Sequence, residues 1–544
     1  MAAQPHRAGH LQVATLLAAV GLAARMAASS PAAEPPAKGA EAIPGACLFT
    51  NGGVLNIRLE ISPADVASLR RDSRKSVRAT LREGKTVQAD IGLHLKGSTG
   101  SFRSIDDKPG LTLSFDKFVA GQTFHGLRKI HLNNSVEDPS FLNEKIGGEL
   151  FRAAGVPAPR VGWATVELNG RRLGMYVLKE GFTEDFLGLH FKNTTGNLYE
   201  GSGHDVHEPL PRNTGVGEAN PSELKALAGA VAETNSVDRW LKLEKVLDMD
   251  RFISFMATEV MICHRDGYCL ARNNYRIYHD PDSDRMIFLP HGMDQLFGRA
   301  DTPVQPSFAG LVAAAVIETP EGRRRYRERL GFLTTNIFDP AALSTRADQW
   351  AAAIRPVLSG REAGSFAREV AAVKERMVAR RACLARLLSE PELKPLQFEN
   401  GVAMLTNWTV ADLPAGGKME QAKAPDGKPA LGIRAGPVTM ASWRCKVLLP
   451  PGRYRFAGAI ATTGVEPLRV AKNKGAGLRI VGVSLPRPHD LTGDHSWTKR
   501  QVEFEVVEPT AEKELICELL ASKGQAWFDL NSLRLESIGH PSAR

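Results

Sequence analysis

The sequence predicts an α+β protein of several domains, in which a mixed helix and strand region is followed by an all-β sandwich. Three observations lead to this prediction. The chain has 544 residues, and domains of roughly 100–200 residues allow two to four of them. Hydrophobic residues make up 43% and charged residues 24% of the chain, as in folded globular proteins. Strand-like and helix-like periodicities alternate up to about residue 395, and only strand-like alternation follows.

The charge balance argues against a protein that binds nucleic acid. Lys and Arg total 69, Asp and Glu total 60, and the formal net charge is therefore +9. Nucleic-acid-binding proteins concentrate basic residues in one patch or arm, whereas acidic residues are interspersed throughout this chain. The basic run from Arg323 to Arg329 lies among apolar residues at helical spacing, as expected of a solvated helix face.

Residues 1–35 are predicted to be an export signal followed by an Ala- and Pro-rich tether. The apolar segment from Val13 to Ala24 has the length of a signal-peptide core, and small residues from Ala27 to Ala33 provide cleavage sites. An Ala-rich disordered tail is the alternative interpretation. No later segment reaches the ~18 apolar residues that a membrane span needs. We therefore expect an exported protein without a transmembrane segment, either secreted, periplasmic or at the cell surface.

The cysteines do not indicate a structural zinc site, because no two of them form a CxxC pair. An exported protein can form disulfides. Cys445 and Cys517 both lie in strand-like segments, so a disulfide between them is a hypothesis.

Between residues 44 and 200, strands dominate and one helix interrupts them. Asp138 followed by Pro139 indicates an N-cap and a first helical residue. Apolar residues then recur at helical spacing until Gly155, so the sequence predicts a helix over about 139–154. The turn Asn169-Gly170 between alternating segments 163–168 and 173–178 predicts a β-hairpin.

From 221 to 395 helical patterns dominate, except for a second predicted hairpin formed by residues 274–278 and 285–289. Beyond 396, alternating runs such as 454–458 and 501–506 predict the all-β sandwich. We therefore expect one domain over 40–395 and a second over 396–544.

Polar residues with a chemical role are concentrated around the second hairpin. Asp294 follows a predicted buried strand, where its carboxylate would project into a cleft and could bind Mg²⁺, Mn²⁺ or Ca²⁺. Asp266 and an Asn from the preceding loop could face it. Phosphoryl transfer needs such a set, with one Asp for the metal ion, an Asn to assist and an Asp to orient the attacking hydroxyl. The alternatives are a loop cap for Asp266 and a helix N-cap for Asp294.

The order of five segments resembles the CotH kinase family, atypical secreted kinases named for a spore-coat protein. The segments are Leu95–Thr99, Lys108-Pro109 with Phe115-Asp116, Phe141–Pro159, Leu168–Glu180 and Asp266–Gly298. The resemblance implies a protein-kinase-like fold for residues 40–395. It also implies ATP and a divalent metal ion, Mg²⁺ or Mn²⁺, as cofactors and the Ser or Thr hydroxyls of exported proteins as substrates.

The resemblance also assigns roles to single residues. Asp294 corresponds to the metal-binding Asp, Asp266 to the catalytic Asp, and Asn274, rather than Asn273, to the second metal ligand. Lys96 would meet phosphate oxygens. The resemblance further implies contacts to ATP from the residues Lys108, Glu144, Glu149 and Glu180. Of these, Glu144 or Glu149 would hold the cation of Lys96, and Glu180 would lie near the adenine. Surface charge is the alternative for Lys96 and for these glutamates.

Three departures from the family pattern bear on activity. The family segment Trp-Asp-x-Asp is His291-Gly292-Met293-Asp294 here, so one carboxylate is missing. The strand before Phe115 has no lysine, which leaves Lys108 as the remaining phosphate contact. The triplet at 264–266 spells His-Arg-Asp, but the nearest Asn follows Asp266 by seven residues (273 − 266), so we interpret the triplet as coincidence.

The C-terminal region resembles galactose-binding-type jelly rolls, a fold shared by many carbohydrate-binding modules, so a polysaccharide is a second expected partner. Exposed Trp rings can stack on sugars, although Trp497 and Trp527 could equally be core residues. The leading hypothesis is a CotH-type protein kinase targeted by this region. The alternatives are a non-catalytic surface or matrix-binding protein on a degenerate kinase-like scaffold and, less well supported, a glycosidase using Asp266 and Asp294.

Overall fold

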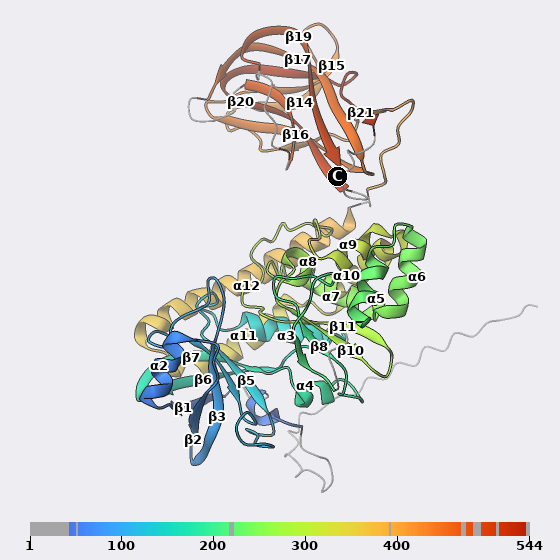
Figure 1. The fold of residues 1–544 in the computed structure, drawn as a ribbon. Coiled ribbons are helices and arrows are strands. Elements are labelled where there is room, and N and C mark those ends of the chain that lie inside the picture. Colours follow the sequence, from blue (N-terminus) through green and yellow to red (C-terminus); the bar gives the residue numbers. More distant parts are fainter. Residues whose placement is uncertain are drawn as a thin grey trace, which may run out of the picture. The chain divides into compact units, whose positions relative to one another are not determined.

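The computed structural model describes residues 43–49, 53–216, 222–390, 393–468, 475–481, 483, 491–506 and 511–539. The predicted export signal, residues 1–35, lies outside the described residues. Within these ranges, none of the helices is both long enough and apolar enough to cross a membrane. Helices and strands are mixed, as the sequence predicts (Figure 1).

The first part of the described chain forms a closed seven-stranded barrel with the strand order β1-β2-β3-β4-β5-β7-β6. Buried leucines such as Leu93, Leu113 and Leu132 fill its interior. The predicted hairpin is confirmed, since Asn169 and Gly170 connect β6 to β7 with φ values of 50° and 79°. The strands are β1 Val54–Glu60, β2 Val77–Glu83, β3 Thr86–Lys96, β4 Gly110–Ser114, β5 Lys129–Asn133, β6 Val161–Leu168 and β7 Arg171–Glu180.

The predicted helix over 139–154 is present but begins later than expected, as α3 Asn143–Ala153. The reason is local, because Phe141 has a φ of 57°, which no α-helix accommodates. Asp138 still accepts a hydrogen bond from the main-chain N–H of Asn143, at 2.9 Å. The sequence analysis missed α2, Pro63–Arg71, although Ser62 caps it and Pro63 occupies its first turn.

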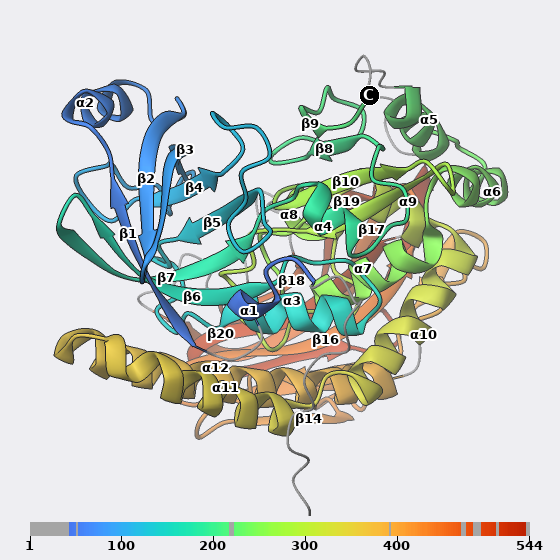
Figure 2. The same cartoon turned by 90° about the horizontal axis from the view of Figure 1, so that it is seen from below.

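A four-stranded sheet with the order β11-β10-β8-β9 and a set of helices follow the barrel. The second predicted hairpin is confirmed as β10 paired with β11. Helices α11 and α12 run side by side (Figure 2). The remaining elements before residue 390 are α1 Ala46–Phe49, α4 Glu184–Gly188, β8 Leu198–Glu200, β9 Arg212–Thr214, α5 Ser222–Val231, α6 Ser236–Val246, α7 Met249–Met261, α8 Tyr268–Ala271, β10 Tyr275–Asp280, β11 Arg285–Pro290, α9 Leu311–Glu318, α10 Pro320–Asn336, α11 Pro340–Ile354, η1 Arg355–Val357 and α12 Gly360–Ser389.

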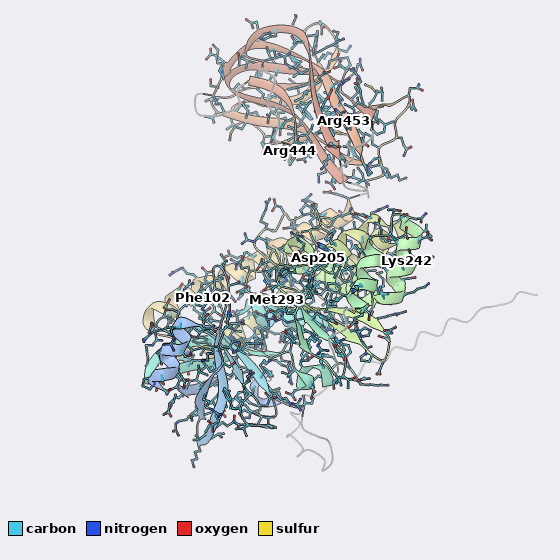
Figure 3. All side chains as sticks on the ribbon, viewed as in Figure 1. Phe102, Asp205, Lys242, Met293, Arg444 and Arg453 are labelled. Atoms are coloured by element: carbon cyan, nitrogen blue, oxygen red, sulfur yellow. The ribbon has the colours of Figure 1, made fainter. Side chains whose placement is uncertain are left out.

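From residue 393 onward, every regular element in the described ranges is a strand, as predicted. The larger buried cluster of this part runs from Leu405 to Leu535 and contains no residue from before 393. Arg444 and Arg453, which are labelled in Figure 3, pair with acidic residues of neighbouring strands. The strands are β12 Val402–Met404, β13 Thr409–Ala411, β14 Lys418–Lys423, β15 Pro429–Arg434, β16 Thr439–Leu449, β17 Gly452–Pro467, β18 Gly475–Ile480, β19 Gly493–Val506, β20 Ala511–Asp529 and β21 Arg534–Gly539.

The hypothesis of a disulfide between Cys445 and Cys517 is not supported, because both are free thiols. They lie on the paired strands β16 and β20, but Cys445 pairs with Leu515 and Cys517 with Trp443. Such diagonal neighbours are about 7–8 Å apart, which exceeds the Cα separation of most disulfides, about 4.4–6.8 Å.

Candidate active site

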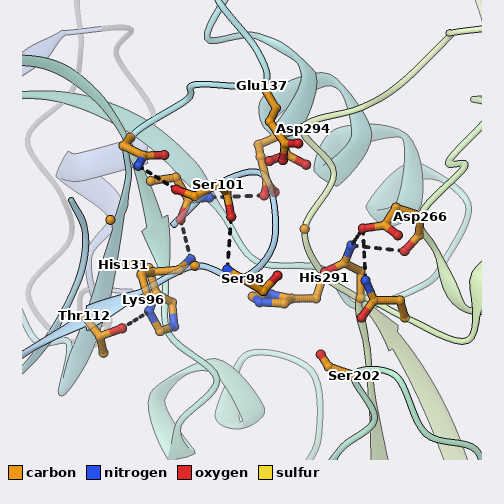
Figure 4. A pocket seen from close by; sticks show the side chains of 18 of the residues that line it. Lys96, Ser98, Ser101, Thr112, His131, Glu137, Ser202, Asp266, His291 and Asp294 are labelled. Carbon is orange, nitrogen blue, oxygen red and sulfur yellow. Dashed lines mark hydrogen bonds between the residues drawn. The ribbon is translucent and has the colours of Figure 1, made fainter. Parts of the chain in front are cut away.

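A cavity of about 950 Å³ lies between the outer face of barrel strands β3, β4 and β5 and the segments around Asp266 and Asp294. Its volume is in the upper range of pockets for small molecules and cofactors, about 300–1,000 Å³. In Figure 4, His291 appears between Lys96 on one side and Asp266 on the other. Five residues that the sequence analysis assigned to the site line this cavity: Lys96, Glu144, Asp266, Asn274 and Asp294.

The barrel side of the cavity is a row of polar side chains at matching register positions. His94, Thr112, His131 and Lys179 are successive cross-strand partners on β3, β4, β5 and β7. Directly opposed residues share one face of a sheet, so these four side chains form one row outside the leucine-filled barrel. Thr112 Oγ1 and His131 Nδ1 lie 3.0 Å apart. Burial and the nearby ammonium of Lys96 hold the pKa of His131 well below its usual range, so this imidazole is neutral.

Lys96 is a partly buried cation, and no carboxylate of the described residues contacts it directly. Its ammonium group donates a hydrogen bond to the side-chain oxygen of Asn133, and Asn133 Nδ2 donates in turn to Glu144 Oε1 at 3.3 Å. Burial and the neighbouring Lys179 lower the pKa of Lys96 to about 8. An anionic ligand beside Lys96 would therefore stabilise its charged form.

Lys179, which the sequence analysis missed, does not line the cavity but contacts two residues that do. Its ammonium group lies 3.0 Å from Glu144 Oε2 and 3.1 Å from His291 Nδ1. The expectation that Glu144 or Glu149 holds the cation of Lys96 is therefore corrected, because Glu144 pairs with Lys179 and reaches Lys96 only through Asn133. The available signal was the hairpin pattern, which places Lys179 between Leu178 and Glu180 in a predicted strand; all three residues are buried in the structure.

Glu149, Lys108 and Glu180 are not among the residues that line the cavity, contrary to expectation. Glu149 lies 3.8 Å from the ammonium of Lys145, and its other oxygen pairs with Arg346. The ammonium of Lys108 lies over the ring of Tyr176, 5.2 Å from its centre. Glu180 is buried and accepts a hydrogen bond from the main-chain N–H of Arg160 at 3.0 Å. Each of these three side chains points away from the cavity and contacts a residue that does not line it.

Lys129 is a cavity lysine on the strand next to the one before Phe115, which has no lysine of its own. It lies on β5 directly opposite Ser114 of β4, so its side chain is on the same face as that of Ser114. It lines the cavity, and burial lowers the pKa of its ammonium group. Within the described part of the chain, no carboxylate forms an ion pair with it. The sequence analysis missed Lys129 because the register between β4 and β5 was unknown.

Asp294 forms the acidic side of the cavity. Burial and the nearby carboxylates of Glu144 and Glu137 raise its pKa to about 7. No side chain in the described ranges donates a hydrogen bond to its carboxylate. Its main-chain carbonyl accepts a hydrogen bond from Asn143 Nδ2 of α3, at 2.7 Å. No helix begins at Asp294, which removes the alternative of an N-cap.

The segment before Asp294 is fixed by close packing. Met293 (Figure 3) lies against Gly147 of α3, where an added Cβ would come within 2.8 Å of its sulfur. Gly292 has a φ of 54°, and an added Cβ would lie 2.3 Å from Asn274 Oδ1. The positive φ and this close approach both favour glycine here, and a larger side chain would have to displace the amide of Asn274.

Asp266 is held by two amides. Its Oδ2 accepts hydrogen bonds from Asn273 Nδ2 at 3.0 Å and from Asn274 Nδ2 at 2.6 Å. Asn274 also donates to the main-chain carbonyl of Asp266, at 3.0 Å. In the described part of the chain nothing donates to Oδ1 of Asp266. The nitrogen of Asn274 is thus engaged with Asp266, and only its oxygen, beside Gly292, remains for the predicted metal ion.

His264 connects the two aspartate segments. Its side chain is fully buried, and Nε2 lies 3.0 Å from the main-chain oxygen of Gly292. Its Nδ1 lies 3.6 Å from Glu259 Oε1. The His-Arg-Asp triplet thus has a structural role that the sequence analysis did not expect, because His264 ties the loop of Asp266 to the segment of Asp294.

A metal ion is compatible with these residues. A divalent cation beside Asp294 would offset the repulsion that its carboxylate experiences from the carboxylates of Glu144 and Glu137. In the ranges that the structure covers, no group of three or more His, Cys, Asp or Glu side chains is arranged to bind a metal ion. Mg²⁺, however, is commonly bound through one or two carboxylates, with water and substrate phosphates completing its shell.

Comparison with known proteins identifies relatives for this region. The CotH kinase protein family profile matches residues 93–373 of the chain, 281 of 544 residues. Invasin CotH2 of Rhizopus delemar is 24% identical over 249 residues, which cover 40% of this chain and 42% of that protein. Inner spore coat protein H of Bacillus subtilis is 24% identical over 243 residues, covering 41% of this chain and 66% of that protein. The match thus spans less than two thirds of either relative.

Among solved structures, the carbohydrate-binding module TmCBM61 in complex with beta-1,4-galactotriose is 16% identical. The match covers 27% of this chain and all of the module, with a TM-score of 0.19. A score this low does not bear on the fold or the ligand of the C-terminal strands.

Proposed function

Because the chain belongs to the CotH kinase protein family, we propose that it is an exported, metal-dependent protein kinase. In this proposal it transfers a phosphoryl group from ATP to Ser or Thr hydroxyls of secreted or surface proteins. The observation that carries the proposal is one cavity that contains both the carboxylate of Asp294 and the ammonium of Lys96, neither of which forms an ion pair with another described residue.

The charges of the cavity match those of a metal–nucleotide complex. Lys96 and Lys129, on the barrel side, form no ion pair with the described carboxylates and would attract phosphate oxygens. Asp294 would hold a cation, with the oxygen of Asn274 as a second ligand. When bound, Mg²⁺ or Mn²⁺ would neutralise the charge that develops on the phosphates. Phosphoryl transfer depends mainly on such positioning and electrostatic stabilisation, with little covalent chemistry from the protein.

Asp266 suits the role of orienting the substrate hydroxyl. Asn273 and Asn274 occupy its Oδ2, which fixes the plane of the carboxylate. Oδ1 can then accept a hydrogen bond from the attacking hydroxyl and take its proton as the new phosphate ester forms. His264 and Asn143 would keep the segments of Asp266 and Asp294 in a constant relative position.

The experiment is to incubate the full chain with labelled ATP and Mn²⁺ or Mg²⁺, and to measure transfer to itself and to a Ser-rich peptide. Metal-dependent ATP binding should be lost in Asp294→Asn and kept in the control Asp301→Asn, whose carboxylate is exposed and pairs with Arg299. Unchanged calorimetric binding in Asp294→Asn would remove this residue from the site. ATP binding without any transfer would instead favour the non-catalytic binding protein, which the missing carboxylate at Gly292 suggests.

For the C-terminal strands we propose a polysaccharide partner that targets the enzyme. Trp527 is only 8% exposed and belongs to a buried cluster, so it is a core residue. Trp497 is partly exposed; its Nε1 donates to Asp426 at 2.7 Å, and the ammonium of Lys428 lies 5.0 Å from its ring centre. Trp497→Ala should be retained less than the unaltered protein on insoluble polysaccharide. Equal retention of the variant and the unaltered protein would exclude Trp497 from binding.

A further inference from the structure

Outside the cavity, a cysteine, a histidine and a glutamate are linked by hydrogen bonds. Cys47 Sγ lies 3.4 Å from His125 Nδ1, and His125 Nε2 lies 2.8 Å from Glu83 Oε2. Cys47 belongs to α1, Glu83 ends β2, and His125 lies in the connection between β4 and β5. With its proton on Nε2, the imidazole donates to Glu83 and accepts the thiol proton of Cys47.

The thiol of Cys47 is accessible to solvent, and the thiols of the other five cysteines are less accessible. Cys47 is exposed, Cys383 is partly exposed, and the remaining four are buried. His125 retains an exposed fraction of 32% and Glu83 of 23%. A small reagent can therefore reach Cys47 while its hydrogen-bonded partners stay in place.

The backbone holds His125 in its position. His125 has a φ of 49° in a tight turn, closed by reciprocal main-chain hydrogen bonds between Phe124 and Leu127 at 2.9 Å. Its main-chain oxygen accepts a hydrogen bond from the N–H of Gly45 at 2.7 Å, which ties the turn to the chain just before Cys47. The imidazole packs edge-on against the ring of Phe124, with ring centres 4.5 Å apart.

We propose that Cys47 is a thiol-modification site that forms mixed disulfides with low-molecular-weight disulfides. His125 takes the thiol proton, and Glu83 stabilises the resulting imidazolium. The Cys47 thiolate attacks one sulfur of the small disulfide, a new S–S bond forms and the old one breaks. The leaving thiolate takes up the proton from His125, so protons and electrons balance without another oxidant.

This site is separate from the proposed kinase chemistry. None of its three residues lines the cavity that contains Asp266 and Asp294. Modification of Cys47 therefore neither requires nor tests phosphoryl transfer. A thiol with a hydrogen-bonded base and an orienting carboxylate has the arrangement of an activated nucleophile, which an isolated surface cysteine lacks.

The test uses the folded full chain and an aromatic disulfide that releases a coloured thiolate. At pH 6.5 an ordinary cysteine, with a pKa near 8.5, is only about 1% thiolate, so unassisted thiols react slowly. We expect one thiol per chain to react in a fast phase. Cys47→Ser should abolish this phase, and the control Cys383→Ser should leave it unchanged. A fast phase that persists in Cys47→Ser would overturn the proposal.

A second variant isolates the role of the imidazole. His125→Asn removes the base while keeping a residue type that tolerates positive φ. At pH 6.5 the fast phase should slow by about 10-fold or more, and at pH 9.5, where hydroxide deprotonates the thiol, the two rates should converge. Equal rates at pH 6.5 would overturn the role of His125. If His125→Asn melts below the assay temperature, Glu83→Gln replaces it, with a smaller slowing of about 3-fold or more expected.

Incubation with cystine identifies the product, because intact mass should then show one mixed disulfide per chain. The adduct should be absent from Cys47→Ser. Modification at Cys383 in place of Cys47 would overturn the proposal, because Cys383 is the less exposed of the two.

Discussion

The ammonium group of Lys179 lies 3.0 Å from Glu144 Oε2, and the two side chains are 0% and 3% exposed. They join strand β7 of the barrel to helix α3. Glu144 also accepts a hydrogen bond from Asn133, which holds Lys96. Lys179 and the cavity residue Lys96 therefore both depend on one carboxylate, and the position of Lys96 depends indirectly on Lys179.

Removing one partner of this pair should be strongly destabilising. We expect Glu144→Gln to lower the free energy of unfolding by about 3–5 kcal/mol, because it leaves the ammonium of Lys179 buried without a countercharge. Urea unfolding measures the effect. The control Glu321→Gln breaks a solvent-exposed pair with Arg324 and should cost less than about 1 kcal/mol. Similar losses in both variants would show that water reaches Lys179.

ATP affinity should distinguish Lys96 from Lys108. Lys96→Met removes an unpaired cation from the cavity and should weaken ATP binding roughly 10–100-fold, the value of a charge-assisted hydrogen bond. Lys108→Met should change affinity by no more than about 2-fold, because this side chain lies over Tyr176 outside the cavity. Isothermal titration with Mn²⁺ and ATP makes the comparison. An equal loss in both variants would place the phosphates elsewhere.

Asp266→Asn should affect transfer more than binding. The amide keeps the shape of the side chain but cannot take the proton of the hydroxyl, so transfer should fall by about 10²-fold or more. The affinity for ATP should stay within a few-fold of the parent. If Asp266 only caps its loop, stability would instead drop by about 1 kcal/mol with turnover per folded molecule unchanged. Transfer rate and melting temperature on one preparation separate these outcomes.

Acid stability should depend on His94. Burial and the nearby ammonium of Lys129 lower the pKa of His94 to about 4, below the usual value near 6.5. Between these two pH values the unfolded chain binds more protons, so stability is lost as the pH falls from 6.5 to 4.

In His94→Gln, the stability lost between pH 6.5 and pH 4 should be smaller by about 1–2 kcal/mol. This value is lower than the full pKa shift would give, because His94 is partly exposed to solvent. Urea unfolding at pH 7.5 and 4.5 gives the difference, with the exposed His207→Gln as control. An unchanged pH dependence in His94→Gln would mean that His94 is protonated freely in the native state.

The C-terminal strands should fold without the rest of the chain. Their main buried cluster extends from Leu405 to Leu535 and is composed only of their own side chains. A fragment of residues 396–544 should therefore melt cooperatively when followed by circular dichroism and calorimetry. An insoluble or molten fragment, together with an unstable 40–395 fragment, would contradict the predicted boundary.

Local sequence patterns determined much of the architecture. The Asn169-Gly170 turn predicted a hairpin that is present, because only a few residue types accept the positive φ values of such a turn. Period-two alternation after residue 396 predicted strands for the same local reason. The helix of residues 143–153 was predicted four residues too long at its start, because the positive φ of Phe141 leaves no sequence signal.

The sequence by itself placed Lys96, Glu144, Asp266, Asn274 and Asp294 among the candidate residues of one site, through the resemblance to the family pattern. It placed Lys108, Glu149 and Glu180 there as well, and these three do not line the cavity. Only the tertiary structure decided which side chains contact one another. Lys179 rather than Lys96 pairs with Glu144, Lys129 lies opposite Ser114, and Cys47 contacts His125 across 78 positions of sequence. A short turn fixes the register only of the two strands that it joins. The register between strands joined by long connections, and the contacts of each side chain, depend on packing between distant segments.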